Sequence, residues 1–256
     1  MRGKQGRRMG LLAAALAVLT AAVGFVSVSG NARQTACYAL QLDARARMER
    51  CMEAVRGYRE ELGLPLSPED FHKTGLIGEE YTDITTTLGS IEAKRTAADP
   101  DMAALLVRMF SEAGLRSGDR VGAGFSGSFP SLNLAVLCAC DAMGLEAVYI
   151  SSVGASTYGA NSPELTFPDM AHRLFLDGLI SHDSALVTPG GDRDNGGGVF
   201  DEEAFVPILK RVESWGIPVM REEDYQKNLS SRLDVYGADG IDCFVAAGGN
   251  ITSMGL

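Results

Sequence analysis

The chain has 256 residues, with 33 acidic against 23 basic side chains and a formal net charge of −10 at pH 7. Its first thirty residues hold four basic and no acidic side chains, so the remaining 226 residues carry a formal charge of −14. Such an acidic surface, without a basic run, repels a phosphate backbone. Nucleic acid is therefore excluded as an expected partner.

The five cysteines are an odd number, which argues against a disulfide framework. Cys37 and Cys51 are expected on one helix, roughly 21 Å apart, too far to pair within a chain. A parallel partner helix would bring like cysteines together, which leaves a homodimer through residues 34–62 as an open alternative. Cys138, Cys140 and Cys243 fall in apolar stretches and are interpreted as core residues.

Residues 1–30 are typical of a membrane segment. An uncharged run at 9–32, apolar in its core at 11–28, follows the basic residues Arg2, Lys4, Arg7 and Arg8. At a rise of 1.5 Å per residue that core spans roughly 27 Å, close to the ~30 Å hydrocarbon core of a bilayer. This length favours an uncleaved anchor over a cleaved signal. The basic flank predicts a single-pass protein of the cytoplasmic membrane with its C-terminal domain on the extracytoplasmic side.

The rest of the chain divides by its hydrophobic pattern. Apolar residues at helical spacing between 34 and 62 predict an amphipathic helix, so residues 31–63 are expected to form a helical stalk. Residues 64–98 have no sustained period and are expected to be an irregular connecting segment. Residues 99–256 are expected to form one further domain.

That domain alternates short apolar runs with helical patterns. The runs are 120–122, 147–151, 185–188, 217–220 and 242–247, and the helices are 101–113, 131–143, 167–180, 202–215 and 223–236. Apolar strands separated by helices predict a doubly wound, Rossmann-like α/β fold with a parallel sheet. Because the chain stops soon after its last predicted strand, we expect the domain to be truncated at its C-terminus.

Ligands bind such sheets beyond the carboxyl ends of the strands. The loop after the first run contains G-x-G-x-x-G at 122–127, but no acidic residue closes the second strand as a dinucleotide site requires. In the same loop Ser126 and Ser128 sit among small residues, like the nucleophile of an α/β hydrolase. Asp169 and either His172 or His182 follow in the order of a hydrolase triad. These features leave catalysis open.

Two further loops follow the next strands. The loop at 151–163 is long and polar, which is typical of functional loops. The glycine-rich loop at 189–198 lacks the spacing of a calcium loop and is expected to be mobile and solvated. The sequence identifies no metal site and no cofactor.

Three segments carry a resemblance to a known family. Residues 84–96, 122–133 and 151–161 resemble the poly-gamma-glutamate system proteins, which are bacterial, membrane-anchored and associated with poly-gamma-glutamate synthesis or export. The family supplies no assigned catalytic residues. The candidate ligand-binding residues therefore come from loop position and chemistry, and they are Thr86, Thr87, Lys94, Arg95, Gly124, Gly127, Ser152, Ser156 and Asn161.

The resemblance implies a membrane-anchored accessory protein whose exported α/β domain binds an anionic ligand or the polymer end. Lys94 and Arg95, after a hydroxyl-rich stretch, are suited to a carboxylate. One alternative is an exported serine hydrolase or transferase acting on gamma-glutamyl amide bonds, with Ser126 or Ser128 as nucleophile. Another is a non-catalytic assembly scaffold. The expected partners are the membrane, other poly-gamma-glutamate synthesis proteins and the polymer.

Overall fold

The computed structural model describes residues 16–20, 36–196, 202–237, 240–249 and 251–254. The chain divides into two compact units, Met1–Ala36 and Cys37–Leu256. In the first unit Leu16–Thr20 are helical, and most of the predicted membrane segment lies outside the described residues. Among the helices that the structure describes, none combines the length and the apolar character needed to cross a bilayer.

The second unit is an α/β domain built on a parallel sheet. Its strands are β1 (Arg120–Phe125), β2 (Glu146–Ser152), β5 (Leu186–Thr188) and β6 (Cys243–Ala247), in the order β5-β2-β1-β6. All neighbouring strands are parallel, and Gly124 of β1 lies opposite Ile150 of β2 and Ala246 of β6. The predicted α/β class with a parallel sheet is confirmed, and the arrangement is consistent with a Rossmann-like fold.

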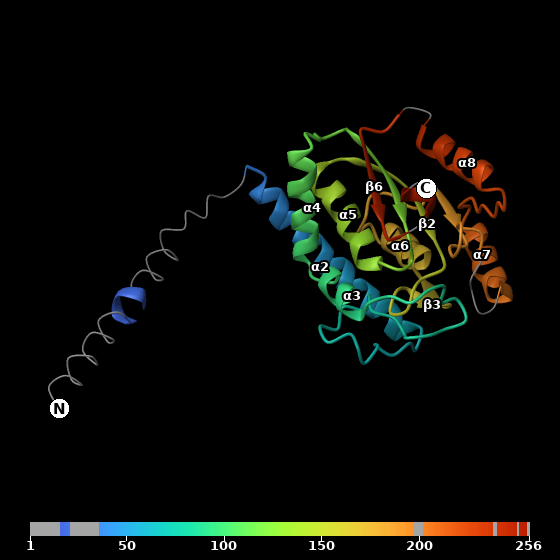
Figure 1. Ribbon diagram of the computed structural model, residues 1–256, viewed down its shortest axis with the longest axis horizontal. Coiled ribbons are helices and arrows are strands. Elements are labelled where there is room, and N and C mark those ends of the chain that lie inside the picture. The colour runs from blue at the N-terminus through green and yellow to red at the C-terminus, as the bar shows by residue number, and fades with distance from the viewer. Residues whose placement is uncertain (1–15, 21–35, 197–201, 238–239, 250, 255–256) are drawn as a thin grey trace, which may run out of the picture. The chain divides into compact units, whose positions relative to one another are not determined.

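Helices account for most of the remaining regular structure. They are α2 (Tyr38–Glu61), α3 (Ile91–Ala97), α4 (Asp101–Glu112), α5 (Pro130–Met143), α6 (Phe167–Leu176), α7 (Phe205–Ser214, preceded by a 3-10 turn at Glu202–Ala204), α8 (Tyr225–Gly237) and α9 (Ile251–Met254). A two-stranded antiparallel hairpin, β3 (Asn161–Ser162) and β4 (Leu165–Thr166), precedes α6. In Figure 1, α2, α4 and α5 lie on one side of this domain, and α7 and α8 lie on the other.

Alternation along the strands explains these two layers. Ala123 and Tyr149 join the main apolar core with α2, α4, α5 and α6, whereas Ile150 packs with Tyr236 of α8. On the face of β1 toward α8, a Cβ added at Gly122 would lie 2.7 Å from the Ile241 side chain and 3.2 Å from Tyr236 of α8, so a larger residue would require these side chains to shift. The strands β1, β2 and β5 are thus covered on both faces, as in other parallel sheets, whereas Phe244 and Ala246 of β6 are exposed.

The predicted stalk helix is part of this domain. One face of α2 is buried against α4 and α5 through Ala44, Met48, Cys51 and Val55. The boundaries at residues 63 and 98 therefore lie inside one compact unit. A homodimer through residues 34–62 stays a prediction, and it would use the opposite, exposed face of the helix.

Two elements differ from the sequence-based expectation. The segment at 217–220 is no full strand, because Val219 makes only an isolated bridge to Val187, across which Val187 N–H donates to the Pro218 carbonyl. Within the expected irregular segment, Ser90 caps the seven-residue helix α3 by accepting the Ala93 N–H at 3.3 Å.

Candidate functional site

A cavity of about 280 Å³ lies at the carboxyl ends of the four parallel strands. Residues that follow β1, β2, β5 and β6 line it, together with two threonines from the segment before α3. The lining residues are Thr86, Thr87, Ser126, Ser128, Ser152, Gly154, Gly191, Asp192, Arg193, Gly249 and Ile251. This is the edge at which open parallel sheets bind their ligands, and it brings together five of the candidate residues from the sequence.

Three serine hydroxyls in this wall are held by backbone groups. Ser126 Oγ accepts the Ser128 N–H at 3.2 Å, Ser128 Oγ accepts the Ser156 N–H at 2.9 Å, and Ser152 Oγ accepts the Gly127 N–H at 3.3 Å. A hydroxyl that accepts one hydrogen bond still has its own proton to donate. The cavity wall therefore offers three fixed oxygens whose O–H groups are available to a ligand acceptor.

The glycine-rich loop itself does not present its backbone to a phosphate. Its N–H groups bind within the protein, since Ser126 N–H donates to Ala247 O at 3.1 Å and Phe129 N–H donates to Ser126 O at 3.2 Å. Gly124 lies inside β1, where an added Cβ would be 2.2 Å from Ser253 Oγ. Gly124 thus allows the close packing of Ser253 against β1 and does not line the cavity. Gly127 lies in the turn after β1 and does not line the cavity either.

Lys94 lies behind the serine wall and is buried, with 2% of its surface exposed. Its Nζ donates to Ser128 O and to Ser156 Oγ, the latter at 2.8 Å, and lies 3.8 Å from the centre of the Phe129 ring. No carboxylate forms an ion pair with it in the part of the chain that the structure describes. Burial lowers the pKa of Lys94 to about 8.

Arg95 does not join Lys94 at the cavity. It pairs with Glu69 and lies 3.8 Å from the centre of the Phe71 ring. Asn161 is fully buried and structural, because its side chain binds the Glu79 backbone and donates to Thr85. The expectation that Lys94 and Arg95 form one basic pair is thus wrong, since adjacent residues of a helix point in different directions.

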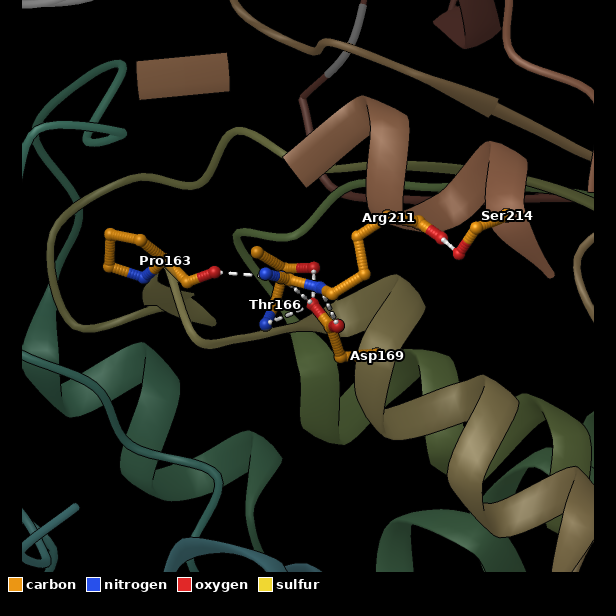
Figure 2. Close-up of polar contacts among 5 residues, drawn as sticks. All are labelled: Pro163, Thr166, Asp169, Arg211 and Ser214. Carbon is orange, nitrogen blue, oxygen red and sulfur yellow. Dashed lines mark hydrogen bonds and ion pairs between the residues drawn. The ribbon is translucent and has the colours of Figure 1, made fainter. Parts of the chain in front are cut away.

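The hydrolase triad suggested by residue order is not assembled. Figure 2 shows Asp169 at the start of α6, where it accepts the Thr166 N–H at 2.9 Å and binds Arg211 from α7 at 2.8 Å. His172 instead binds Asp183 at 2.6 Å and stacks on Trp215. The carboxylate of Asp169 completes a helix cap, so neither side chain is arranged to activate Ser126 or Ser128.

The loop after β5, described up to residue 196, contains a buried acidic side chain. Asp194 is fully buried and forms an ion pair with Arg232 of α8, which is itself only 3% exposed. Arg232 Nε also donates a hydrogen bond to Asn228 Oδ1 at 2.8 Å. Residues Arg193 and Asp194 have φ of 49° and 63°, a conformation that costs free energy in residues other than glycine. The expectation of a solvated loop is therefore wrong for Asp194, whereas Asp192 and Arg193 are exposed as expected. The mobility of the loop stays a prediction.

Six lining residues are not among the sequence candidates, namely Gly154, Gly191, Asp192, Arg193, Gly249 and Ile251. All six follow predicted strands, so their position at strand ends was the available signal. Asp192 and Arg193 are the only charged residues among those that line the cavity. Among the described residues, no group of three or more His, Cys, Asp or Glu side chains lies together in the way that metal ligands would.

Comparisons of the chain with protein-family models, with curated proteins and with solved structures find no match.

Proposed function

We propose that the α/β domain binds a carboxylate-bearing ligand in the strand-end cavity. The observation that carries this proposal is the set of three O–H donors from Ser126, Ser128 and Ser152, each oriented by a backbone N–H. Hydroxyl donors beside an arginine suit an oxyanion, and Arg193 supplies that charge at the rim. The four parallel strands hold these groups at one edge.

The proposed ligand is the end of a poly-gamma-glutamate chain, and the proposed role is that of a membrane-anchored accessory protein in synthesis or export of the polymer. The sequence resemblance and the basic, apolar first thirty residues support this role. The net acidic charge of the chain disfavours binding along a polyanion. A cavity of about 280 Å³ suits one terminal residue, whose carboxylates can meet local donors.

Calorimetric titration of the full chain with short gamma-glutamyl oligomers tests this proposal. Hydrogen bonds to a charged group contribute about 1.5–3 kcal/mol, so Ser126→Ala or Ser152→Ala is expected to weaken binding roughly 10- to 100-fold. Ser230→Ala is the matched control, because Ser230 is exposed on α8. Equal affinity in all three variants, or no binding by folded protein, would contradict the proposal, and the latter would favour an assembly scaffold.

Lys94 favours a second candidate function, an exported serine hydrolase or transferase acting on gamma-glutamyl amide bonds. With its pKa at about 8, about a tenth of this amine is neutral at pH 7, and this neutral form can accept a proton. Lys94 contacts Ser156 Oγ, and the Ser156 N–H contacts Ser128 Oγ. In this mechanism Ser128 Oγ attacks the amide carbon, and the neutral Lys94 amine accepts the serine proton once substrate binding brings the two groups together. Lys94 then gives that proton to the departing amine, and water hydrolyses the acyl-serine. The Ser156 N–H donates to Ser128 Oγ and orients it.

Product analysis on the same titration samples separates the two functions. The second candidate predicts cleavage or transfer that is lost in Ser128→Ala and in Lys94→Met but kept in Ser126→Ala. Binding without any product would leave ligand binding as the function and exclude the gamma-glutamyl amide as a substrate under those conditions.

A further inference from the structure

Two cysteines meet across the interface between α2 and α5. Cys51 of α2 and Cys138 of α5 have their Sγ atoms 3.9 Å apart, and both side chains are fully buried. They are 87 residues apart in the chain. The contact joins two helices that pack closely within the main core. It involves no residue of the strand-end cavity.

The two sulfur atoms have different surroundings. Cys51 Sγ also lies 3.9 Å from the Leu179 carbonyl oxygen. The hydrogen bond from Cys138 lowers the pKa of Cys51, whereas the same bond and burial raise the pKa of Cys138. Cys51 is therefore the thiol that more readily becomes the thiolate, which is the nucleophilic form in disulfide exchange.

The neighbouring cysteine of α5 does not share this contact. Cys140 is buried as well, but residues two apart on a helix do not share a face. Only the Cys51–Cys138 pair has its sulfur atoms in contact among the described residues. An odd number of cysteines argues against a disulfide framework, yet it leaves room for one bridge and three free thiols.

We infer that Cys51 and Cys138 form a disulfide when the chain folds under oxidising conditions, so that α2 is covalently joined to α5. The oxidant is a small-molecule disulfide. Before the two helices pack, the thiolate of either cysteine attacks one of the oxidant's sulfurs and releases one thiol, and the thiolate of the other cysteine then attacks this mixed disulfide and releases the second. Two protein thiols are oxidised and one oxidant disulfide is reduced to two thiols, which take up the two protons.

Burial determines when this exchange occurs. Because neither sulfur is exposed in the folded domain, an oxidant reaches them before α2 packs against α5. Folded, reduced protein is expected to react slowly, and protein refolding in the presence of oxidant is expected to react fully. This difference separates a bridge that belongs to the fold from incidental surface oxidation.

The experiment refolds the full chain from urea in detergent with a mixture of oxidised and reduced glutathione, and then counts free thiols after denaturation. The expected result is three free thiols of the five, with a single cross-linked peptide pair that contains Cys51 and Cys138. Cys51→Ala and Cys138→Ala are each expected to keep all four remaining thiols. Cys140→Ala is the matched control and is expected to keep two. Counting under denaturing conditions makes the buried thiols accessible to the reagent, and the circular dichroism of each variant before denaturation checks that it has folded.

The oxidised wild type is also expected to melt roughly 5–15 °C higher than its reduced form, since a bridge that closes a long loop restricts the unfolded chain. Five free thiols after oxidative refolding would overturn the inference. So would a bridge to Cys140 or Cys37, or covalent dimers on a non-reducing gel. None of these readouts depends on ligand binding at the strand-end cavity.

Discussion

Two cations are buried near the strand-end cavity, and they differ in their partners. Arg232 forms an ion pair with the buried Asp194, whereas the ammonium group of Lys94 contacts a carbonyl oxygen, a hydroxyl and an aromatic ring, and no carboxylate among the residues that the structure describes. The paired arginine holds the backbone that presents Arg193 at the cavity rim. The lysine without a carboxylate keeps a lowered pKa behind the serine wall. The comparison indicates that an ion pair holds the backbone at the cavity rim, whereas Lys94, behind the three serines, can gain or lose a proton at mildly alkaline pH.

The largest effect is expected where the paired cation is removed. Arg232→Met leaves the buried Asp194 carboxylate without its partner, which is expected to lower the free energy of unfolding by about 3–5 kcal/mol. Urea denaturation at neutral pH measures this change. In the double variant with Asp194→Asn, the buried charge is gone and most of the loss is expected to be recovered.

A loss below about 1 kcal/mol in Arg232→Met would show that the pair is dispensable. A double variant no more stable than the single one would show that the lost packing of Arg232, and not the stranded charge, accounts for the effect. Either result would remove the contrast with Lys94.

The unpaired cation predicts a dependence of stability on pH. Lysine has a pKa of 10.5 in the unfolded chain, and burial lowers the pKa of Lys94 to about 8 in the fold. Between these values the unfolded chain binds a proton that the folded chain has released, so stability rises with pH across this window. From pH 7.5 to pH 10, wild type is expected to gain about 2 kcal/mol relative to Lys94→Met.

Urea denaturation of both proteins at several pH values measures that difference. The matched control is Lys210→Met, because Lys210 is an exposed lysine of α7 and its removal is expected to leave the pH dependence of wild type unchanged. Parallel curves for wild type and Lys94→Met would mean that Lys94 is as well solvated, or as well compensated, in the fold as in the unfolded chain.

How far the sequence predicts these features depends on the range of the interactions involved. The predicted helix at 131–143 and strand at 242–247 lie within one residue of α5 and β6, because apolar spacing is a local property. Helix α3 was missed because seven residues are too few for a helical period to appear. The hydroxyl candidates Ser126, Ser128 and Ser152 were found because they directly follow strands.

Contacts between side chains that are distant in the chain could not be predicted from the sequence. Asp194 and Arg232 come from a loop and a helix that are distant in the chain, and only packing shows that they meet in the interior. The Cys51–Cys138 contact is of the same kind. Residue order suggested that Asp169 follows Ser126 as a triad member, but the local capping box with Thr166 determines its role.

The smallest effects are expected at ion pairs that water reaches. Arg211 is about one third exposed and binds both carboxylate oxygens of Asp169, at 2.8 and 2.9 Å, as well as the Pro163 carbonyl (Figure 2). Arg211→Met is expected to cost about 1 kcal/mol, since Asp169 keeps its bonds to Thr166 and stays satisfied. Arg108→Met, which removes an exposed pair with Glu112 within one helix, is expected to leave the urea midpoint unchanged. If Arg211→Met and Arg108→Met lowered the free energy of unfolding equally, the remaining hydrogen bonds of the carboxylate partner would not determine the size of the loss. The contrast between Arg232 and Lys94 would then need another physical basis.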